Sequence, residues 1–360
     1  MRILVLANFD LGLYNFRKEL LKKLIDMGHE VFISLPYGEK VDLLTEMGCK
    51  FIDTKLDRRG INPVTDFKLI TTYLKLVKRV SPDKVITYTI KPNIYGGIVC
   101  RLKNIQMYAN VTGLGTAFQG SGLLTKLVTA LYRLAFKKVT TVFFENEENR
   151  DIIVGKGIIP KEKTHCLHGA GVNIDEYSFS EYPENGTIHF LFIGRIMREK
   201  GVDELFEAAE RLKTDGTDIV VDVVGSFEDD YQEQVHTLDK RGIIKYHGYQ
   251  SDVKPFIEQS HCFVLPSYHE GMANTLLECG AMGRPLITSN IHGCLEAVQD
   301  GITGYLCNVK DADDLYKRMK QFIALPYEEK KKMGRLSHEY VASVFDKKKV
   351  VEETVGEIMR

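Results

Sequence analysis

Residues 261–278 read HCFVLPSYHEGMANTLLE, which predicts a strand, a loop and the start of a helix. The apolar run from His261 to Leu265 is typical of a buried strand, and Pro266-Ser267 breaks it before helical character begins near Asn274. In α/β proteins, ligands bind where a strand ends and a helix follows. The free N–H groups and the positive dipole at a helix start favour a phosphate or another anion there.

Two carboxylates, Glu270 and Glu278, flank the start of this helix and stand eight residues apart. If the segment is largely helical, a rise of about 1.5 Å per residue separates them by roughly 10–12 Å. The paired carboxylates of a retaining glycosidase are only about 5–5.5 Å apart, and this separation is also long for an inverting pair. We therefore expect the two acids to contact different parts of one ligand.

The rest of the chain alternates short apolar runs with helical patterns, which predicts parallel, doubly wound α/β sheets. In the first half the expected strands are residues 2–7, 31–35, 50–52, 84–88, 106–111 and 140–144. The expected helices there are residues 15–27, 65–80, 94–103, 122–138 and 147–155, with a loop over residues 7–14. In the second half the expected strands are residues 188–194, 219–225, 243–246, 261–265 and 285–288.

A polar stretch over residues 173–187, with Pro183 and Gly186, predicts a linker between two domains. The expected domains are an N-terminal domain over residues 1–170, a C-terminal domain over 171–340 and a final helix over 341–360 that we expect to cross back to the N-terminal domain. Two Rossmann-like halves leave a cleft between the carboxyl ends of their sheets, and that cleft is the expected site.

The composition fits a soluble globular protein: of 360 residues, 44% are apolar and 27% are charged, and the net charge is −1. Such a length accommodates two domains of ordinary size. The seven cysteines are scattered without a CxxC pair, which disfavours a zinc site or a disulfide framework and fits a reducing cytosol. The chain enters a strand at Arg2, which predicts no signal peptide, and no apolar run is long enough to span a membrane.

A second charged turn follows the strand at 188–194 and reads Gly194-Arg195-Ile196-Met197-Arg198-Glu199-Lys200-Gly201. Arg195 and Lys200 are five residues apart on a turn that opens a helix, so both cations can converge on one diphosphate with help from helix N–H groups. A solvated, charged turn is the alternative. Because this turn and the Glu270–Glu278 segment both lie at carboxyl ends of strands in the same half, we favour the diphosphate site.

In these motifs the chain resembles the retaining glycosyltransferases of family 4, which have the GT-B fold of two facing Rossmann-like domains. The resemblance covers nearly the whole chain and is strongest in the second half. It rests on Phe192-Ile193-Gly194-Arg195 with Lys200-Gly201, on the E-x7-E spacing of Glu270 and Glu278, on Gly225, and on Gly304-Tyr305-Leu306.

The resemblance implies a donor site for a nucleotide-sugar in the second half. Arg195 and Lys200 would neutralise its diphosphate. Glu278 would bind the ribose hydroxyls, Glu270 would lie against the sugar, and Gly225 would allow close approach near the nucleobase, which is expected to be uracil. The full expected donor-binding set is Gly12, Gly194, Arg195, Lys200, Gly225, Glu270, Gly271, Met272, Ala273, Asn274, Thr275 and Glu278.

The two cations take the electrostatic role of a metal ion, so neither a metal nor another cofactor is expected. Asp229-Asp230 does not follow a strand directly and is interpreted as a helix cap.

The resemblance also implies that the first half binds the acceptor. Many family members carry a His there that contacts the donor sugar, but of ten histidines only His29 precedes residue 165, at the wrong end of the sheet. We expect Lys91 or Asn93 to substitute for it, with a structural loop as the alternative. Thr112 and Gly113, in the loop up to residue 116, are expected near the reacting sugars. The catalytic candidates are therefore Glu270, Arg195, Lys200 and Lys91.

Residues 123–139 predict an amphipathic helix with leucines on one side. It is either a core-facing helix with a solvated basic side or a helix that lies on an anionic membrane, where each Lys or Arg contributes about 1 kcal/mol. Its basic residues are Lys126, Arg133, Lys137 and Lys138. Further basic residues of the first half, which suit a polyprenyl-diphosphate acceptor, are Arg58, Arg59, Lys75, Lys78 and Arg79.

We predict a metal-independent glycosyltransferase that moves a sugar from a UDP-sugar to a lipid-linked saccharide with retained configuration. We expect it in the cytoplasm, on the inner face of the membrane, with no nucleic-acid partner. Residues 88–93 and 110–115 look like bacterial members that build capsule, O-antigen or glycan precursors on undecaprenyl diphosphate, which favours an N-acetylhexosamine donor. Front-face transfer, assisted by the departing phosphate, is favoured over a covalent Glu270 intermediate.

Three other functions stay open from the sequence. A UDP-sugar 2-epimerase shares the fold, but it needs several acid/base groups in the cleft, and the first half is poor in histidine. An NAD oxidoreductase requires GxGxxG after the first strand, where only Gly12 is found. A catalytically silent nucleotide-sugar-binding protein is compatible with the same motifs.

Overall fold

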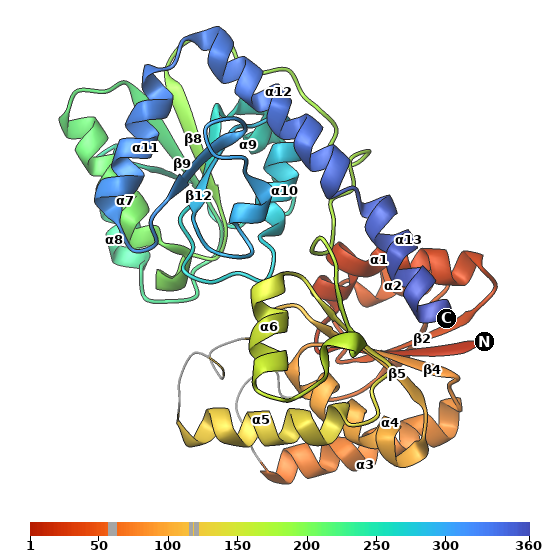
Figure 1. The fold of residues 1–360 in the computed structure, drawn as a ribbon. Helices are drawn as coiled ribbons and strands as arrows, with labels where there is room; N and C mark the ends of the chain where they lie inside the picture. Colours follow the sequence, from red (N-terminus) through yellow and green to blue (C-terminus); the bar gives the residue numbers. More distant parts are fainter. Residues whose placement is uncertain (57–62, 115–117, 119–121) are drawn as a thin grey trace. The chain divides into compact units, whose positions relative to one another are not determined.

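The computed structural model describes residues 1–56, 63–114, 118 and 122–360 (Figure 1). The chain divides into two compact units: unit 1 is Met1–Ala170 with Lys347–Arg360, and unit 2 is Gly171–Asp346. Each unit is built on a parallel β-sheet with helices on its faces. The predicted α/β fold with two Rossmann-like halves is confirmed.

Unit 1 contains a parallel sheet of strand order β3-β2-β1-β4-β5-β6-β7. The strand order reverses between β1 and β4, because the chain first adds β2 and β3 on one side and then returns to the other. The described strands are β1 (Arg2–Leu6), β2 (Glu30–Leu35), β3 (Lys50–Asp53), β4 (Lys84–Tyr88), β5 (Gln106–Val111), β6 (Thr141–Phe144) and β7 (Thr164–Cys166). The described helices are α1 (Asp10–Asp26), α2 (Val41–Glu46), α3 (Pro63–Val80), the π-helical turn η1 (Pro92–Gly96), α4 (Gly97–Lys103), α5 (Leu123–Phe136), α6 (Glu147–Gly155), the 3-10 turn η3 (Lys161–Lys163) and α13 (Lys347–Met359).

Two apolar layers cover the faces of this sheet (Figure 1). On one face, α1 packs beside α13, with Leu20 and Leu24 in the same cluster as Val351 and Ile358. Helices α3, α4 and α5 cover the other face. The last helix is therefore part of the core of unit 1.

Helix α1 begins at Asp10, five residues earlier than the sequence pattern suggested. Leu13, Leu20 and Leu24 are buried on one face, because spacings of seven and four residues correspond to about two turns and one turn. Asp10 in the first turn suits the helix dipole and accepts a hydrogen bond from the Lys40 N–H at 2.6 Å. The loop expected over residues 7–14 is wrong beyond Phe9.

Unit 2 contains a parallel sheet of strand order β10-β9-β8-β11-β12-β13, which reverses between β8 and β11. Strand β13 was not expected, and β10 is shorter than the predicted run at 243–246. The described strands are β8 (Ile188–Ile193), β9 (Ile219–Val224), β10 (Lys245–Tyr246), β11 (Cys262–Leu265), β12 (Leu286–Ser289) and β13 (Gly304–Cys307). The described helices are η4 (Arg198–Lys200), α7 (Val202–Thr214), α8 (Gln232–Lys240), α9 (Lys254–Gln259), α10 (Asn274–Ala281), η5 (Leu295–Ala297), α11 (Ala312–Ala324) and α12 (Tyr327–Val344).

The stretch expected as a linker, residues 173–187, packs against unit 2. Tyr182 is buried, and its hydroxyl donates a hydrogen bond to the His261 carbonyl at 2.8 Å. The fully buried Arg284 donates to the Glu181 carbonyl at 3.1 Å and lies 5.8 Å from the centre of the Tyr182 ring. The contacts of Tyr182 and Arg284 hold residues 173–187 against the rest of unit 2, although the composition of this stretch is polar.

Candidate active site

Two loops meet at the carboxyl edge of the unit 2 sheet, where its strand order reverses. Strands β8 and β11 are neighbours there, so the turn after β8 lies beside the loop after β11. Lys200 from the first loop forms an ion pair with Glu270 from the second. The Ser267 hydroxyl donates a hydrogen bond to the same carboxylate oxygen of Glu270 at 2.8 Å. The two motifs that the sequence singled out are therefore brought into direct contact.

Gly201 allows the close approach of these two loops, and Gly293, in the loop after β12, allows a third loop to approach Glu270. Gly201 has a φ of +71°, and a Cβ there would lie 2.0 Å from the Pro266 carbonyl oxygen. Gly293 has a φ of +90°, and a Cβ there would lie 2.8 Å from the Glu270 carbonyl oxygen. Any other residue at these two positions pushes the loops apart. Gly293 and Ser267 were missed by the sequence analysis, since neither belongs to the motifs around Glu270 and Lys200.

Helix α10 begins directly after the Glu270 loop. Its N-cap residue, Ala273, has no side chain that can cap the helix, so the first helical N–H groups receive no side-chain cap from it. Met272 and Ala273 are buried, and the Ala273 N–H donates to the Gly293 carbonyl at 2.8 Å. The arrangement suits an anion at the start of α10.

The remaining residues of the E-x7-E segment lie along the same helix and loop. Gly271, Asn274, Thr275 and Glu278 are partly exposed. The Oδ1 atom of Asn274 is buried and has no hydrogen-bond partner in the described part of the chain. Burial, and after it the charge of Glu278, raises the pKa of Tyr177. Glu270 therefore lies in the loop before α10, whereas Glu278 lies on the helix itself.

Arg195 stands apart from the Lys200–Glu270 pair. Its side chain is 53% exposed, and its Nη1 lies 3.7 Å from the Glu228 carboxylate. A guanidinium so loosely held can turn toward a ligand at low cost. Asp229 accepts a hydrogen bond from the Arg198 N–H at 2.9 Å, so it caps the turn that carries both cations. The sequence analysis expected Asp229 to cap the following helix, but the N-cap residue of α8 is Tyr231.

Gly225 at the end of β9 is in contact with Gly194 at the end of β8. A Cβ on Gly225 would lie 1.8 Å from the Gly194 carbonyl oxygen, and the Gly225 N–H donates to the Gly248 carbonyl at 2.9 Å. The two strand ends can approach this closely only because position 225 has no side chain. Gly225 is therefore required by the backbone whether or not it contacts a ligand.

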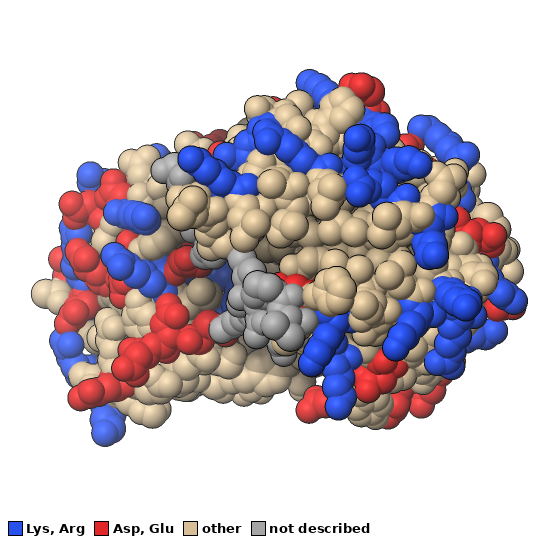
Figure 2. Space-filling view, turned by 90° about the horizontal axis from the view of Figure 1, so that it is seen from below, with Lys and Arg blue, Asp and Glu red and all other residues tan. Residues whose placement is uncertain are grey.

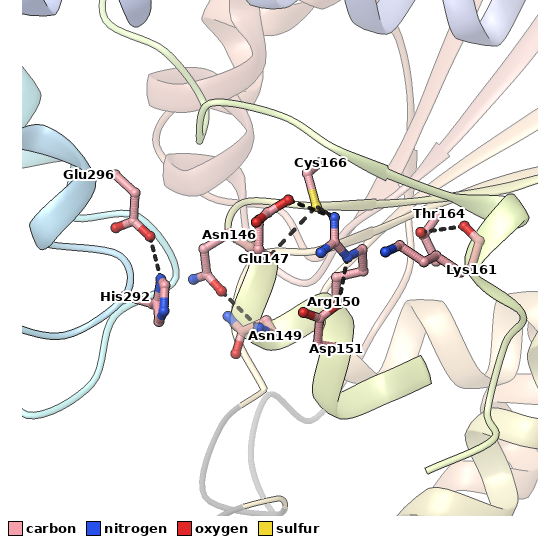
Figure 3. Close-up of polar contacts among 10 residues, drawn as sticks. All are labelled: Asn146, Glu147, Asn149, Arg150, Asp151, Lys161, Thr164, Cys166, His292 and Glu296. Atoms are coloured by element: carbon pink, nitrogen blue, oxygen red, sulfur yellow. Dashed lines mark hydrogen bonds and ion pairs between the residues drawn. The ribbon is translucent and has the colours of Figure 1, made fainter. Parts of the chain in front are cut away.

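Glu296 stabilises the turn that contacts the Glu270 loop. In Figure 3, the side chains of His292 and Glu296 point toward each other, and their Nδ1 and Oε1 atoms are 2.7 Å apart. Glu296 also accepts a hydrogen bond from the Gly293 N–H at 2.7 Å. This carboxylate thus holds the turn that supports Glu270.

Metal ligands do not gather in the described residues: no group of three His, Cys, Asp or Glu side chains there is arranged to hold an ion. All seven cysteines are free thiols. No helix in the described ranges is both long and apolar enough to cross a bilayer.

Two first-half candidates have structural roles. Lys91 forms an ion pair with Asp66 of α3 at 3.0 Å, and both side chains are largely buried. Asn93 is 1% exposed; its carbonyl oxygen accepts from the Thr87 hydroxyl at 2.6 Å, and its amide donates to the Asn110 carbonyl at 2.8 Å. Both side chains are engaged by other residues of unit 1, which favours the alternative of a structural loop over a role in place of the missing imidazole.

Three other first-half positions lie at the carboxyl edge of the unit 1 sheet. Gly12 belongs to the first turn of α1 and not to a loop, and a Cβ there would lie 2.7 Å from the Phe9 ring. Thr112 and Gly113 follow β5 and are partly exposed. Gly115 and Thr116, of the same expected loop, lie outside the described residues, as do Arg58 and Arg59.

A small pocket at this edge is lined by a buried ion pair that the sequence did not reveal. Arg17 of α1 and Glu145 after β6 are 2.7 Å apart, and each side chain is about 9% exposed. Thr112 lines the same pocket. The partners are 128 residues apart in sequence, so no local pattern could have predicted this contact.

Several polar side-chain contacts connect the residues of the segment that follows Glu145 (Figure 3). The Asn146 side chain caps α6 by accepting from the Asn149 N–H at 2.8 Å. Arg150 contacts Asp151 at 2.8 Å and Glu147 at 2.9 Å, and these carboxylates, that of Asp151 first, raise its pKa. Its Nη1 also lies 3.4 Å from the Cys166 thiol on β7.

Helix α5 carries exposed leucines on the outside of unit 1. Thr125, Val128 and Tyr132 face the core, whereas Leu123 is 85% exposed and Leu127 is 48% exposed. Other exposed residues of this helix and the turn after it are Leu124, Lys126, Arg133, Leu134, Lys137 and Lys138. Figure 2, which views the molecule from below, shows Lys and Arg gathered beside uncharged surface on this side.

Two of these basic side chains also donate hydrogen bonds to residues outside the helix. Arg133 donates to the Gly157 carbonyl at 3.3 Å, and Lys138 donates to the Asn104 side chain at 3.1 Å. Thr125, Val128 and Tyr132 are among the residues that form the buried side of this helix, whereas several of its leucines are exposed, so the alternative of a helix whose leucines face the core does not describe these leucines.

Two family models match the chain. The model described as glycosyl transferases group 1 matches residues 173–339, and the model described as glycosyl transferase 4-like matches residues 2–146. Together they cover most of both units.

Two curated relatives align over most of their length. An N,N'-diacetylbacillosaminyl-diphospho-undecaprenol alpha-1,3-N-acetylgalactosaminyltransferase of Campylobacter jejuni is 29% identical over 338 residues, or 89% of this chain and 88% of that protein. A UDP-Gal:alpha-D-GlcNAc-diphosphoundecaprenol alpha-1,3-galactosyltransferase of Escherichia coli is 26% identical over 277 residues, or 71% of this chain and 70% of that protein.

Solved structures share the fold at low sequence identity. HepE from Anabaena, in complex with UDP and glucose, has a TM-score of 0.83 at 14% identity and covers 100% of this chain and 99% of its own. A glycosyltransferase from Rickettsia africae has a TM-score of 0.80 at 20% identity and covers 100% of this chain and 98% of its own.

Proposed function

We propose that this chain, which belongs to the family-4 type of glycosyltransferase with the GT-B fold, transfers an N-acetylhexosamine from a UDP-sugar to a polyprenyl-diphosphate-linked saccharide. The observation that carries this proposal is the alignment, over 338 residues, with the Campylobacter jejuni N-acetylgalactosaminyltransferase, whose acceptor is a diphospho-undecaprenol saccharide. The relatives named above are transferases, so the epimerase and oxidoreductase alternatives are not favoured.

The proposed donor site is the carboxyl edge of the unit 2 sheet. The diphosphate lies at the start of α10, where Arg195 and Lys200 neutralise it and stabilise its departure. Glu278 binds the ribose, and Gly225 lies near the uracil. Glu270 contacts the transferred sugar through the carboxylate oxygens that its pairing with Lys200 orients.

The proposed reaction retains the configuration of the sugar through front-face transfer. The bond from the anomeric carbon to the diphosphate oxygen breaks, and the bond from that carbon to the acceptor hydroxyl forms on the same face. The hydroxyl proton passes to the departing phosphate, which Arg195 and Lys200 hold. These cations stabilise the negative charge of the departing diphosphate, as a metal ion does in other enzymes, so we propose that turnover does not need a metal.

The test is UDP release from a panel of UDP-sugars, with and without a lipid-linked saccharide acceptor, in the presence of EDTA. Acceptor-dependent release from one UDP-N-acetylhexosamine is the expected result. No release from any donor, together with UDP binding in a thermal-shift assay, would instead indicate a catalytically silent nucleotide-sugar-binding protein. Release that EDTA abolishes and added Mg²⁺ restores would refute metal independence alone.

We further propose that unit 1 lies on the inner face of the cell membrane through the exposed side of α5. Leu123 and Leu127 supply apolar area there, and the surrounding cations are attracted to anionic lipid at about 1 kcal/mol per residue. This position brings the enzyme to a lipid-linked acceptor.

Flotation with vesicles of phosphatidylglycerol and phosphatidylcholine tests this surface. The variant Leu123→Ser with Leu127→Ser and Lys126→Ala is expected to lose most vesicle binding at unchanged thermal midpoint. The matched control is Leu102→Ser, which removes another exposed leucine, on α4. Equal recovery of the α5 variant and the native protein would refute the proposal.

A further inference from the structure

Tyr268 connects the loop that carries Glu270 to the turn that carries Lys200. Its backbone N–H donates a hydrogen bond to the carbonyl of Glu199, in η4, at 2.8 Å. Its hydroxyl lies 2.7 Å and 2.8 Å from the two carboxylate oxygens of Glu204, in the first turn of α7. Tyr268 therefore binds the turn through its main chain and the following helix through its side chain.

The Tyr268 side chain is enclosed where it makes this contact. The residue is 7% exposed, and the Lys310 ammonium lies 4.9 Å from the centre of its ring. Burial, followed by the hydrogen bond with Glu204, raises the pKa of Tyr268. The phenol therefore keeps its proton at neutral pH and donates a hydrogen bond to the carboxylate. Hydrogen bonds to charged groups are the stronger kind, so this bond is suited to fixing the position of a loop.

Together these contacts form a closed ring that includes the Lys200–Glu270 ion pair. Glu204 stands four residues after Lys200, and Tyr268 stands two residues before Glu270. The ion pair and the hydrogen bond between Tyr268 and Glu204 close the ring. Glu270 lies in the loop between β11 and α10, so its position depends on the contacts that this loop makes with neighbouring segments.

A second tyrosine makes the same kind of contact with the neighbouring residue of α7. The hydroxyl of Tyr231, the N-cap residue of α8, donates to the Asp203 carboxylate at 2.9 Å. Both tyrosines thus stabilise the acidic first turn of α7, which also suits the helix dipole. Of the two, Tyr268 alone belongs to the loop that carries Glu270. The two hydroxyls therefore differ in their connection to the ion pair.

We infer that Tyr268 and Glu204 form a positioning pair that sets the placement of Lys200 relative to Glu270. The hydrogen bond holds the Glu270 loop against α7, and α7 begins two residues after Lys200. Tyr268 acts through Glu270 in this role and is assigned no contact with donor or acceptor. The effect of the pair on turnover rests on the proposed function, whereas its effect on the ion pair is measured without substrate.

The first test measures how strongly Lys200 and Glu270 depend on each other for stability. Thermal midpoints are recorded for Lys200→Met, Glu270→Gln and the double variant, and the departure from additivity is their coupling. In the native background we expect a coupling of about 2–6 °C. In a Tyr268→Phe background it should fall by about half or more. In the matched Tyr231→Phe background it should stay within about 1 °C of the native value.

Changes at Glu204 remove the same hydrogen bond from its other end. Glu204→Gln keeps an oxygen that accepts from the Tyr268 hydroxyl, so it should keep most of the coupling. Glu204→Ala should lose the coupling as Tyr268→Phe does. This pair of variants keeps the test decisive if Tyr268→Phe does not fold.

The second test measures turnover with UDP-N-acetylgalactosamine as donor and N-acetylglucosamine-diphospho-undecaprenol as acceptor. Tyr268→Phe should lower kcat by about 10- to 100-fold and keep UDP affinity within about threefold, because a displaced Glu270 affects the reacting sugar more than the nucleotide. The loss should disappear in a Glu270→Gln background, since both changes act on one group. Tyr231→Phe should keep kcat within about twofold of native.

Three results would overturn the positioning pair. They are a native coupling in the Tyr268→Phe background, no coupling in the native protein, and an equal loss of coupling in Tyr268→Phe and Tyr231→Phe. The last result would mean that both tyrosines only stabilise α7. A native protein without turnover would refute the proposed function, and the thermal measurements would still decide whether Tyr268 and Glu204 position the ion pair.

Discussion

Arg195 and Lys200 are expected to contribute similarly to nucleotide binding but differently to stability. We consider Arg195→Met and Lys200→Met, which remove the charge and keep an apolar stem of similar length. Arg195 is 53% exposed and its Nη1 lies 3.7 Å from the Glu228 carboxylate, whereas the Lys200 and Glu270 side chains are 19% and 11% exposed and in direct contact. Both cations belong to the turn that faces the start of α10.

The magnitudes follow from these environments. A charge-assisted hydrogen bond contributes about 1.5–3 kcal/mol, so either variant should weaken UDP by about 10- to 150-fold. Loss of the exposed Arg195 pair should cost about 0–1 kcal/mol of folding free energy. Loss of Lys200 leaves the mostly buried Glu270 carboxylate with Ser267 as its remaining donor, for which we expect about 1–3 kcal/mol, or about 3–8 °C in thermal midpoint.

Titration calorimetry with UDP and differential scanning fluorimetry measure the two effects on the same samples. The matched control is Arg198→Met, an exposed arginine of the same turn that is not assigned to the diphosphate. The double variant Lys200→Met with Glu270→Gln should recover part of the lost midpoint, because it also removes the unpaired carboxylate.

Two results would refute this reasoning. UDP affinity within twofold of native in Arg195→Met would remove Arg195 from the diphosphate site. An unchanged thermal midpoint in Lys200→Met would show that the contact with Glu270 does not stabilise unit 2.

Three further outcomes are expected. Glu270→Gln should keep UDP affinity within about threefold and lower turnover by about 100-fold or more, as rapid-quench and binding assays on one preparation would show; equal turnover would exclude contact with the reacting sugar. Gly225→Ala should lower the thermal midpoint and abolish UDP binding, because its Cβ would lie 1.8 Å from the Gly194 carbonyl oxygen, and native behaviour in both assays would contradict the close approach. Burial lowers the pKa of His261 from its ordinary 6.5, and its Nδ1 accepts from the His189 N–H, so the unfolded chain binds a proton that the folded chain does not. The thermal midpoint should therefore fall as pH drops below about 6.5, and His261→Gln should reduce that slope; an identical slope would assign the effect to other groups.

The sequence was informative wherever the deciding interaction is local. Short apolar runs separated by helical patterns predicted two parallel α/β sheets, because the period of side-chain burial is set by the backbone of each element. The turn with Arg195 and Lys200 and the segment from Glu270 to Glu278 were placed at strand ends by the same local patterns, and the structure brings Lys200 onto Glu270.

The sequence was uninformative where the deciding partner belongs to another element of the fold. Lys91 was a candidate until Asp66, on another element, was found 3.0 Å from it. Asn93 was a candidate until its amide was found bonded to Asn110. In both cases a polar residue after a strand looked available, because sequence patterns do not show which distant group already satisfies it.

By itself, the sequence of this protein predicted the alternation of strands and helices and the two charged motifs at strand ends, since these follow from spacing along the chain. Only the tertiary structure decided which polar groups are paired and which are not. It buried the Arg17–Glu145 pair, placed Gly293 next to Glu270, and left the Tyr88 and Thr89 hydroxyls without hydrogen-bond partners in the described residues. The physical reason is that hydrogen bonding and burial depend on neighbours in space, which chain packing supplies from segments that the local pattern does not connect.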